Sequence, residues 1–111
     1  MRQIVVAPQA RRDFKSLLAH SRVRFGPERE QRYRALCVRA FVDLRDAPDR
    51  RGAKAIGDGR YLYPLRFSRN AMAGSDRVAR PRHVIVYRFD DAQLQILALL
   101  HEAMDLPTRL R

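Results

Sequence analysis

The sequence predicts an α+β domain in which a strand and a helical hairpin precede an antiparallel sheet of three to four strands with a C-terminal tail. Three observations predict it. A short β-branched run opens the chain, two segments with apolar residues at helical spacing follow, and the second half carries apolar runs that alternate or break at turn residues. This order and a length of 111 residues indicate one domain over residues 1–111.

The first strand and the first helix meet at a proline. Ile4 to Val6 form the β-branched run, and Ala7-Pro8 closes it. Proline suits a first helical position because its missing N–H would have no partner there anyway. Gly26 is expected to cap this helix and Pro27 to begin the next. The helical spacing between these points is carried by Ala10, Phe14, Leu17, Leu18 and Ser21.

The second helix has the clearest pattern in the chain. It keeps an i, i+3, i+4, i+7 apolar stripe, and acidic residues near its start suit the helix dipole. It ends at Ala47-Pro48, because proline disfavours the helical conformation in the residue before it. Residues 49–59 are charged and glycine-bearing, which predicts a loop. The apolar stripe consists of Tyr33, Leu36, Cys37, Ala40, Phe41 and Leu44.

Three further strands follow, over residues 61–67, 83–89 and 94–100. Pro64 cannot donate to a ladder, so the first of them is expected at an edge or with a bulge. The 68–82 connection is long enough to be either functional or peripheral. Alternation places Leu94, Ile96, Ala98 and Leu100 on one face and Gln95, Leu97, Leu99 and His101 on the other. The last strand is then apolar on both faces, which predicts a central strand whose second face is covered by a partner chain or by the C-terminal tail.

Charge points to an acidic partner. Lys and Arg number 23 against 12 Asp and Glu, and Lys15 and Lys54 are the only lysines. Guanidinium groups suit phosphates and carboxylates, so the partner is nucleic acid or an acidic protein, unless the arginines reflect only the base composition of the genome. The lone Cys37 excludes an internal disulfide and predicts a buried thiol in the cytoplasm. No stretch is long and apolar enough to span a bilayer, and no signal sequence is recognisable.

Several motifs together resemble the ParE branch of the RelE/ParE toxin superfamily. They are Ala10-x-x-Asp13-Phe14, Phe25-Gly26, Leu44-x-x-x-Pro48, Arg66, His83-Val84-Ile85-Val86-Tyr87-Arg88 and Leu100-His101-x-x-Met104-Asp105. The resemblance covers essentially the whole chain. It departs from the family at Ala7, where many relatives have a Ser or Thr cap, and in the length of the 68–82 connection.

The resemblance implies the toxin of a type II toxin–antitoxin pair, silenced by an antitoxin whose flexible C-terminal segment wraps around it. ParE proteins inhibit DNA gyrase, whereas RelE relatives are ribosome-dependent mRNA endonucleases. The favoured interpretation is a gyrase inhibitor without chemistry of its own, which arrests growth. A RelE-like endonuclease and a non-toxic basic nucleic-acid-binding domain stay as alternatives. No cofactor and no metal are expected.

A nuclease would need a base, an acid and cations around the phosphate. Only Arg66, Arg82, His83, Tyr87 and His101 could provide them. His83 and Tyr87 would lie roughly 13 Å apart on one strand, too far to act on one phosphate. Arg66 in a strand interior is expected to bind a target or to pair with Asp13 or Asp105, and His101 could clasp Asp105 across one helical turn. Residues expected to bind the target or antitoxin are Arg11, Arg12, Arg66, Arg69, Arg77, Arg80, Arg82, His101, Met104 and Asp105.

Overall fold

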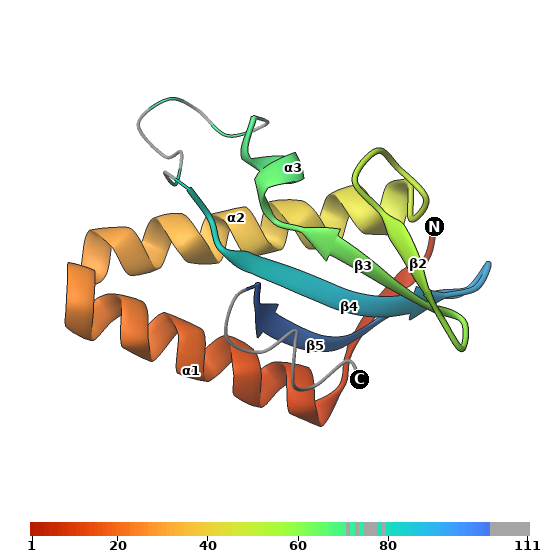
Figure 1. Ribbon diagram of the computed structural model, residues 1–111, viewed down its shortest axis with the longest axis horizontal. Coiled ribbons are helices and arrows are strands. Elements are labelled where there is room, and N and C mark those ends of the chain that lie inside the picture. Colours follow the sequence, from red (N-terminus) through yellow and green to blue (C-terminus); the bar gives the residue numbers. More distant parts are fainter. Residues whose placement is uncertain (71, 73, 75–77, 79, 103–111) are drawn as a thin grey trace.

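The computed structural model describes residues 1–70, 72, 74, 78 and 80–102 and confirms the α+β class. Strand β1 (Gln3–Val6) leads into helices α1 (Pro8–Phe25) and α2 (Pro27–Asp46). A sheet of five strands follows, in the order β1-β5-β4-β3-β2 (Figure 1). The remaining elements are β2 (Lys54–Gly57), β3 (Arg60–Pro64), the short helix α3 (Arg66–Arg69), β4 (His83–Phe89) and β5 (Gln93–His101). Only β1 pairs in parallel, with β5, and the other pairs are antiparallel.

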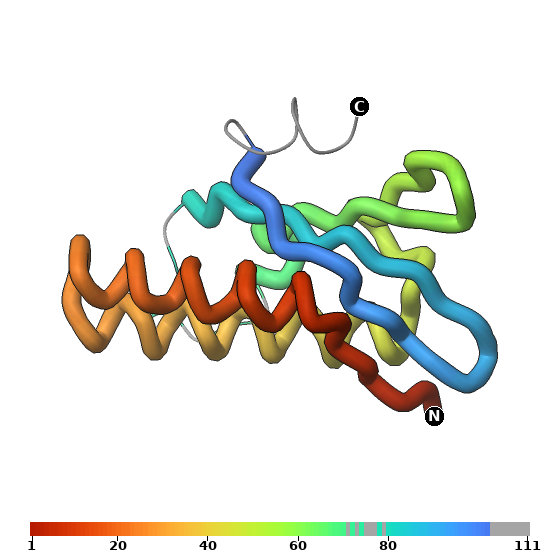
Figure 2. Tube along the Cα trace, turned by 90° about the horizontal axis from the view of Figure 1, so that it is seen from below, coloured from red at the N-terminus to blue at the C-terminus, as the bar shows by residue number. Residues whose placement is uncertain are grey.

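The two long helices run antiparallel along one face of the sheet (Figures 1 and 2). The main core lies between these layers, and its fully buried members include Leu36, Leu44 and Ile85. The opposite face carries a smaller apolar cluster of Val84, Val86, Ala98 and Leu100, against which Ile56, Leu62 and Leu97 pack. As predicted, the last strand is central, since β5 lies between β1 and β4, and it is apolar on both faces. Residues 103–111, expected as a cover for the second face, lie outside the described residues.

The predicted helix boundaries are confirmed. α1 begins at Pro8 without a side-chain cap because Ala7 has no oxygen to offer. Gly26 adopts φ +92°, a value that L side chains rarely reach, and its N–H donates to the Arg22 carbonyl. Pro27 then starts α2 immediately, so the hairpin closes in a single residue.

Two predictions about the middle of the chain are wrong. The expected loop at 49–59 contains β2, which pairs with β3 through a tight turn whose residues 57–59 all have positive φ. The expected strand 61–67 stops at Pro64, which ends β3 but does not place it at an edge, because β2 lies beyond it. Proline has no N–H to continue the ladder, and the chain turns into α3 directly afterwards.

A β-bulge corrects the predicted alternation of the last strand. Val86 pairs with Ala98 but Tyr87 pairs with Ile96, so Leu97 is an extra residue in β5. Before the bulge Leu94 and Ile96 face the helices, and after it Leu99 does. β1 pairs only with the first half of β5, and the N–H of Leu99 donates instead to Asp13 Oδ2 of α1 at 3.0 Å. Asp13 therefore fastens α1 to β5.

Candidate functional site

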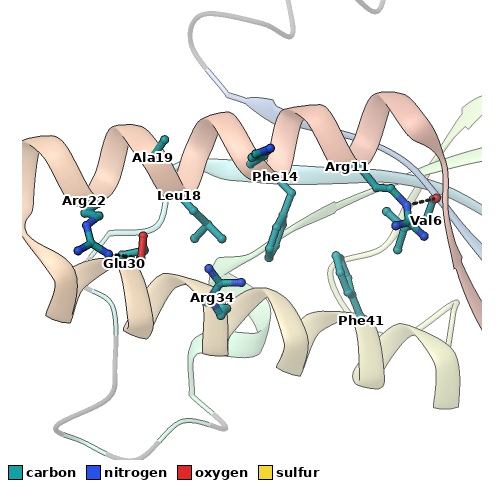
Figure 3. Close-up of a pocket in the computed structure, with 10 residues that line it drawn as sticks. Val6, Arg11, Phe14, Leu18, Ala19, Arg22, Glu30, Arg34 and Phe41 are labelled. Atoms are coloured by element: carbon teal, nitrogen blue, oxygen red, sulfur yellow. Dashed lines mark hydrogen bonds and ion pairs between the residues drawn. The ribbon is translucent and has the colours of Figure 1, made fainter.

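The helix groove is a hollow on the outer side of the hairpin between α1 and α2 (Figure 3). Its volume is about 620 Å³. Phe14 and Phe41 face one another across it with ring centroids 6.0 Å apart, and Leu18 lies beside them. The described residues that line it are Val6, Arg11, Phe14, Lys15, Leu18, Ala19, Arg22, Glu30, Arg34 and Phe41. An apolar floor between basic side chains suits an amphipathic acidic polypeptide.

Two of the basic side chains in this groove already make contacts within the chain. Arg11 Nε donates to the Val6 carbonyl at 3.3 Å, and Arg22 pairs with Glu30 at 3.6 Å (Figure 3). The prediction placed both Arg11 and Arg12 in a binding surface. Arg12 does not line the groove, and its guanidinium donates to Gln9 on the same helix.

A second hollow, the histidine–arginine pocket, lies where α1 ends, α2 begins, β4 starts and β5 stops. Its volume is about 390 Å³, and all three histidines of the chain line it. His83 and His101 are opposite one another in the ladder, with ring centroids 5.2 Å apart. The described residues that line it are Leu17, His20, Ser21, Arg24, Phe25, Arg29, Tyr33, Arg80, Arg82, His83 and His101. The predicted residues Arg80, Arg82, His83 and His101 are thus brought together.

Tyr33 organises this pocket from its floor. Its hydroxyl lies 2.9 Å from His83 Nδ1 and accepts the backbone N–H of Arg82 at 3.3 Å. Burial raises the pKa of Tyr33 far above its usual value, so the hydroxyl keeps its proton and can donate it to Nδ1. A neutral His83 then carries its own proton on Nε2.

The β-bulge explains why both imidazoles reach the same pocket. His101 lies five residues after Ile96, so in a strand that alternated regularly the two side chains would lie on opposite faces. The shift at Leu97 places His101 on the helix side with His83 and Tyr33. His101 is the last residue of β5, and the contact expected between it and Asp105 is not tested by the described residues. Asp105, Met104 and Arg77 lie outside the described residues.

A third hollow, of about 410 Å³, is lined by Arg50, Arg51, Arg66, Phe67, Arg69 and Asn70. The prediction that Arg66 lies in a strand interior is wrong. Arg66 lies in α3, and its side chain is about half exposed. It pairs with Glu102 at 2.5 Å, whereas the predicted partner Asp13 accepts from the N–H of Leu99 and the other predicted partner, Asp105, lies outside the described residues. Arg69 Nε donates to the Val78 carbonyl at 2.7 Å, so it anchors the 68–82 connection, where Val78 is fully buried.

The Asp43 cluster lies beside this hollow and was missed by sequence reasoning. The buried carboxylate of Asp43 binds Arg39 at 2.7 Å, Arg50 at 2.8 Å and the hydroxyl of Ser68 at 2.6 Å. Tyr63 in turn lies 2.8 Å from Ser68 Oγ. The i, i+4 spacing of Arg39 and Asp43 was the only local signal for it.

The five nuclease candidates do not converge on one point. Tyr87 is fully buried, and its hydroxyl donates to the Pro48 carbonyl at 2.5 Å. Burial also raises the pKa of Tyr87, and neighbouring Tyr61 and Tyr63 add to this. Arg66 belongs to the third hollow. Only Arg82, His83 and His101 share a pocket.

Sequence reasoning did not single out His20, Ser21, Arg24, Arg29 or Tyr33 as site residues. Tyr33 and Ser21 were read as parts of apolar helix stripes, which is where they lie. Among the described residues, no three His, Cys, Asp or Glu side chains lie close enough to hold a metal ion. No described helix is long and apolar enough to cross a bilayer.

Comparisons with known proteins find one matching family model and structures of the same fold. The family model described as the ParE toxin of the type II toxin–antitoxin system parDE matches residues 4–106. A solved structure, the chromosomal ParDE toxin–antitoxin system from P. aeruginosa, superposes with a TM-score of 0.68 at 17% identity, over 91% of this chain and 96% of that one. At this identity the likeness shows a shared fold. No curated protein sequence matches the chain.

Proposed function

The chain belongs to the ParE toxin family of type II toxin–antitoxin systems, and from that premise we propose that it arrests growth by binding and inhibiting DNA gyrase until a cognate, ParD-like antitoxin neutralises it. Gyrase acts on DNA in the cytoplasm, which is where a chain with one buried free thiol is expected.

One observation favours inhibition by binding over cleavage. The aromatic hydroxyl that could have served as a nuclease acid or base, that of Tyr87, is enclosed in the core and already donates to a carbonyl. Arg66 lies in a different hollow from the histidines. An RNA-cleaving site requires its acid, base and cations within hydrogen-bond reach of one phosphate. The dispersed candidates support a toxin that acts through its surface.

The helix groove is the surface proposed for the antitoxin. Its floor of Phe14, Leu18 and Phe41 would receive the apolar side of an amphipathic segment. Arg11, Lys15 and Arg34 would attract acidic side chains along the other side of that segment. A net charge of +11 favours an acidic partner in the same way.

A gyrase supercoiling assay tests the proposal. Purified toxin is expected to reduce supercoiling in a dose-dependent way, and adding its cognate antitoxin is expected to restore it. The matched control is toxin that has been mixed with antitoxin before gyrase is added. Full supercoiling at high toxin excess contradicts gyrase as the target.

A specific observation favours a second candidate, a RelE-like mRNA endonuclease. Arg82, His83 and His101 supply two imidazoles and a cation in one pocket, which could provide the acid, the base and the charge stabilisation. Transcript cleavage in a translation extract, lost on His83→Ala and kept on Arg88→Ala, supports this candidate and displaces the first. Intact transcripts with a folded protein exclude it.

A further inference from the structure

The histidine–arginine pocket is lined by cations and contains no described carboxylate. Of the 11 described residues that line it, seven are Arg or His and none is Asp or Glu. Arg24, Arg80 and Arg82 form no ion pair with any carboxylate in the described part of the chain. Neighbouring arginines repel one another unless an anion lies between them, so such a lining favours an anionic ligand.

A buried hydroxyl points to a ligand independently of the charges. Ser21 lines this pocket and is 4% exposed, and its Oγ has no hydrogen-bond partner among the described residues. A buried polar group without a partner costs free energy, so buried polar atoms are almost always satisfied. A ligand with acceptor oxygens in the pocket would satisfy it.

The backbone that presents two of the arginines is held in place. Arg82 donates its N–H to Tyr33 and accepts the N–H of Glu102 at 2.9 Å. Arg80 adopts φ +51°, a left-handed value that is uncommon outside glycine and is found at functional sites where the surroundings enforce it. Because the backbone of such an arginine is already fixed, less conformational entropy is lost when its guanidinium group binds an anion.

The pocket also offers flat apolar surface. Phe25 lies beneath the guanidinium groups of Arg24 and Arg29, at 5.7 and 5.0 Å from its ring centroid. The rings of Tyr33, His83 and His101 form a second group of aromatic faces and edges. A volume of about 390 Å³ exceeds the needs of a lone phosphate and lies within the range of small-molecule sites, roughly 300–1,000 Å³.

We propose that the histidine–arginine pocket binds a nucleotide, with its phosphate held by Arg82, Arg80 and the histidines and its base against the aromatic rings. Arginine pairs with phosphate through two parallel bonds, and bases stack on aromatic and guanidinium planes. The ligand is either a free nucleotide or one nucleotide of a single strand. The inference rests on neither gyrase inhibition nor cleavage, since it concerns only equilibrium binding.

Calorimetric titration of the full chain with AMP, adenosine and a single-stranded trinucleotide tests the proposal. AMP is expected to bind saturably and adenosine at least tenfold more weakly. Arg82→Gln is expected to weaken AMP binding about tenfold, the loss of one charge-assisted contact, and Ser21→Ala a few-fold. The matched control is Arg88→Gln, which removes the same charge from an exposed position on β4, outside the pocket, and should leave AMP affinity within about twofold.

The outcomes separate the two sources of ligand. A trinucleotide that binds more tightly than AMP, with the same loss on Arg82→Gln, assigns the pocket to a strand. Equal affinities assign it to a free nucleotide. The proposal is overturned if neither AMP nor the trinucleotide binds, or if adenosine binds as tightly as AMP. It is also overturned if Arg88→Gln weakens AMP binding as much as Arg82→Gln does. Failure of this proposal would leave the proposed inhibition of gyrase untouched, because the supercoiling assay tests that function separately.

Discussion

The Asp43 cluster and the histidine–arginine pocket are both rich in arginine, but they differ in the source of the opposing charge. In the Asp43 cluster a buried carboxylate binds Arg39, Arg50 and Ser68 within 2.8 Å, and every one of these contacts lies within the described chain. In the pocket no described carboxylate is among the lining residues, and the hydroxyl of Ser21 has no hydrogen-bond partner in the described part of the chain.

The difference teaches how to interpret an arginine-rich sequence. Arginines that meet an internal carboxylate hold the fold together, as Asp43 joins α2 to α3 and to the loop before β2. Arginines without such a partner are kept at some cost in repulsion, which a ligand would relieve. The number of arginines is therefore uninformative until each one is placed relative to the acidic side chains.

The largest expected effect is on stability, in the Asp43 cluster. Asp43→Ala leaves two guanidinium groups and a buried hydroxyl without their acceptor and should lower the free energy of unfolding by about 3–5 kcal/mol. Arg82→Gln should change it by less than about 0.5 kcal/mol. Urea unfolding of both variants measures this. A loss below 1 kcal/mol in Asp43→Ala would contradict the claim that this cluster stabilises the fold.

The second-largest effect is on antitoxin binding at the helix groove, whose floor is apolar, unlike the two arginine-rich sites. Phe14→Ala should weaken the binding of an acidic amphipathic antitoxin segment roughly tenfold to a hundredfold, because aromatic anchors dominate such interfaces. It should leave AMP binding unchanged. Val38→Ala, an exposed apolar residue on α2 outside the groove, is the control. Calorimetry with both ligands distinguishes the surfaces, and equal losses in the two variants would argue against the groove.

The third effect depends on pH and concerns the floor of the pocket. Burial raises the pKa of Tyr33, so above its ordinary value near pH 10 the unfolded chain loses a proton that the folded chain keeps. Stability is therefore complete below pH 10 and falls above it, by about 1.4 kcal/mol per pH unit for this one group. Tyr33→Phe should flatten that decline in urea unfolding at pH 9, 10 and 11. An unchanged slope would mean that the hydroxyl is not protected.

The smallest effect compares two buried serines. Ser21→Ala removes an unsatisfied hydroxyl from a helix and should raise the free energy of unfolding by about 0.5–1 kcal/mol. Ser68→Ala removes a hydroxyl that donates to Asp43 and should lower it by about 1–3 kcal/mol. Thermal unfolding of the two variants reports the signs. Destabilisation by Ser21→Ala would show that this hydroxyl is satisfied and would weaken the case for a ligand.

The helical half of the fold could be predicted because its signals are local. Pro8, Gly26, Pro27 and Pro48 mark the helix ends through backbone geometry that depends on one or two residues. β2 could not be predicted in this way, because only Ile56 among its four residues packs on an apolar cluster. Its strand conformation comes from pairing with β3, which the sequence does not display.

The site residues were predictable only in part. His83 and His101 stood out as polar residues at strand ends, but their meeting depends on an extra residue in β5. Leu94 to Leu100 is apolar almost throughout, so no break in alternation reveals where that residue lies. Arg66 was misplaced because the strand pattern continued past Pro64, while the partner of Arg66, Glu102, is set by tertiary contact.

Because of the bulge at Leu97, β5 contributes both to the hydrophobic core and to the histidine–arginine pocket. Up to Ile96 the strand supplies the hydrophobic interior, and beyond the extra residue its parity is inverted, so that an imidazole points where leucines would otherwise continue. If Leu97 paired with Val86 in regular alternation instead of bulging, Leu100 rather than His101 would lie opposite His83, and the polar hollow would become more core. The chemistry of this corner of the molecule thus depends on the pairing register of a strand as much as on the identity of its residues.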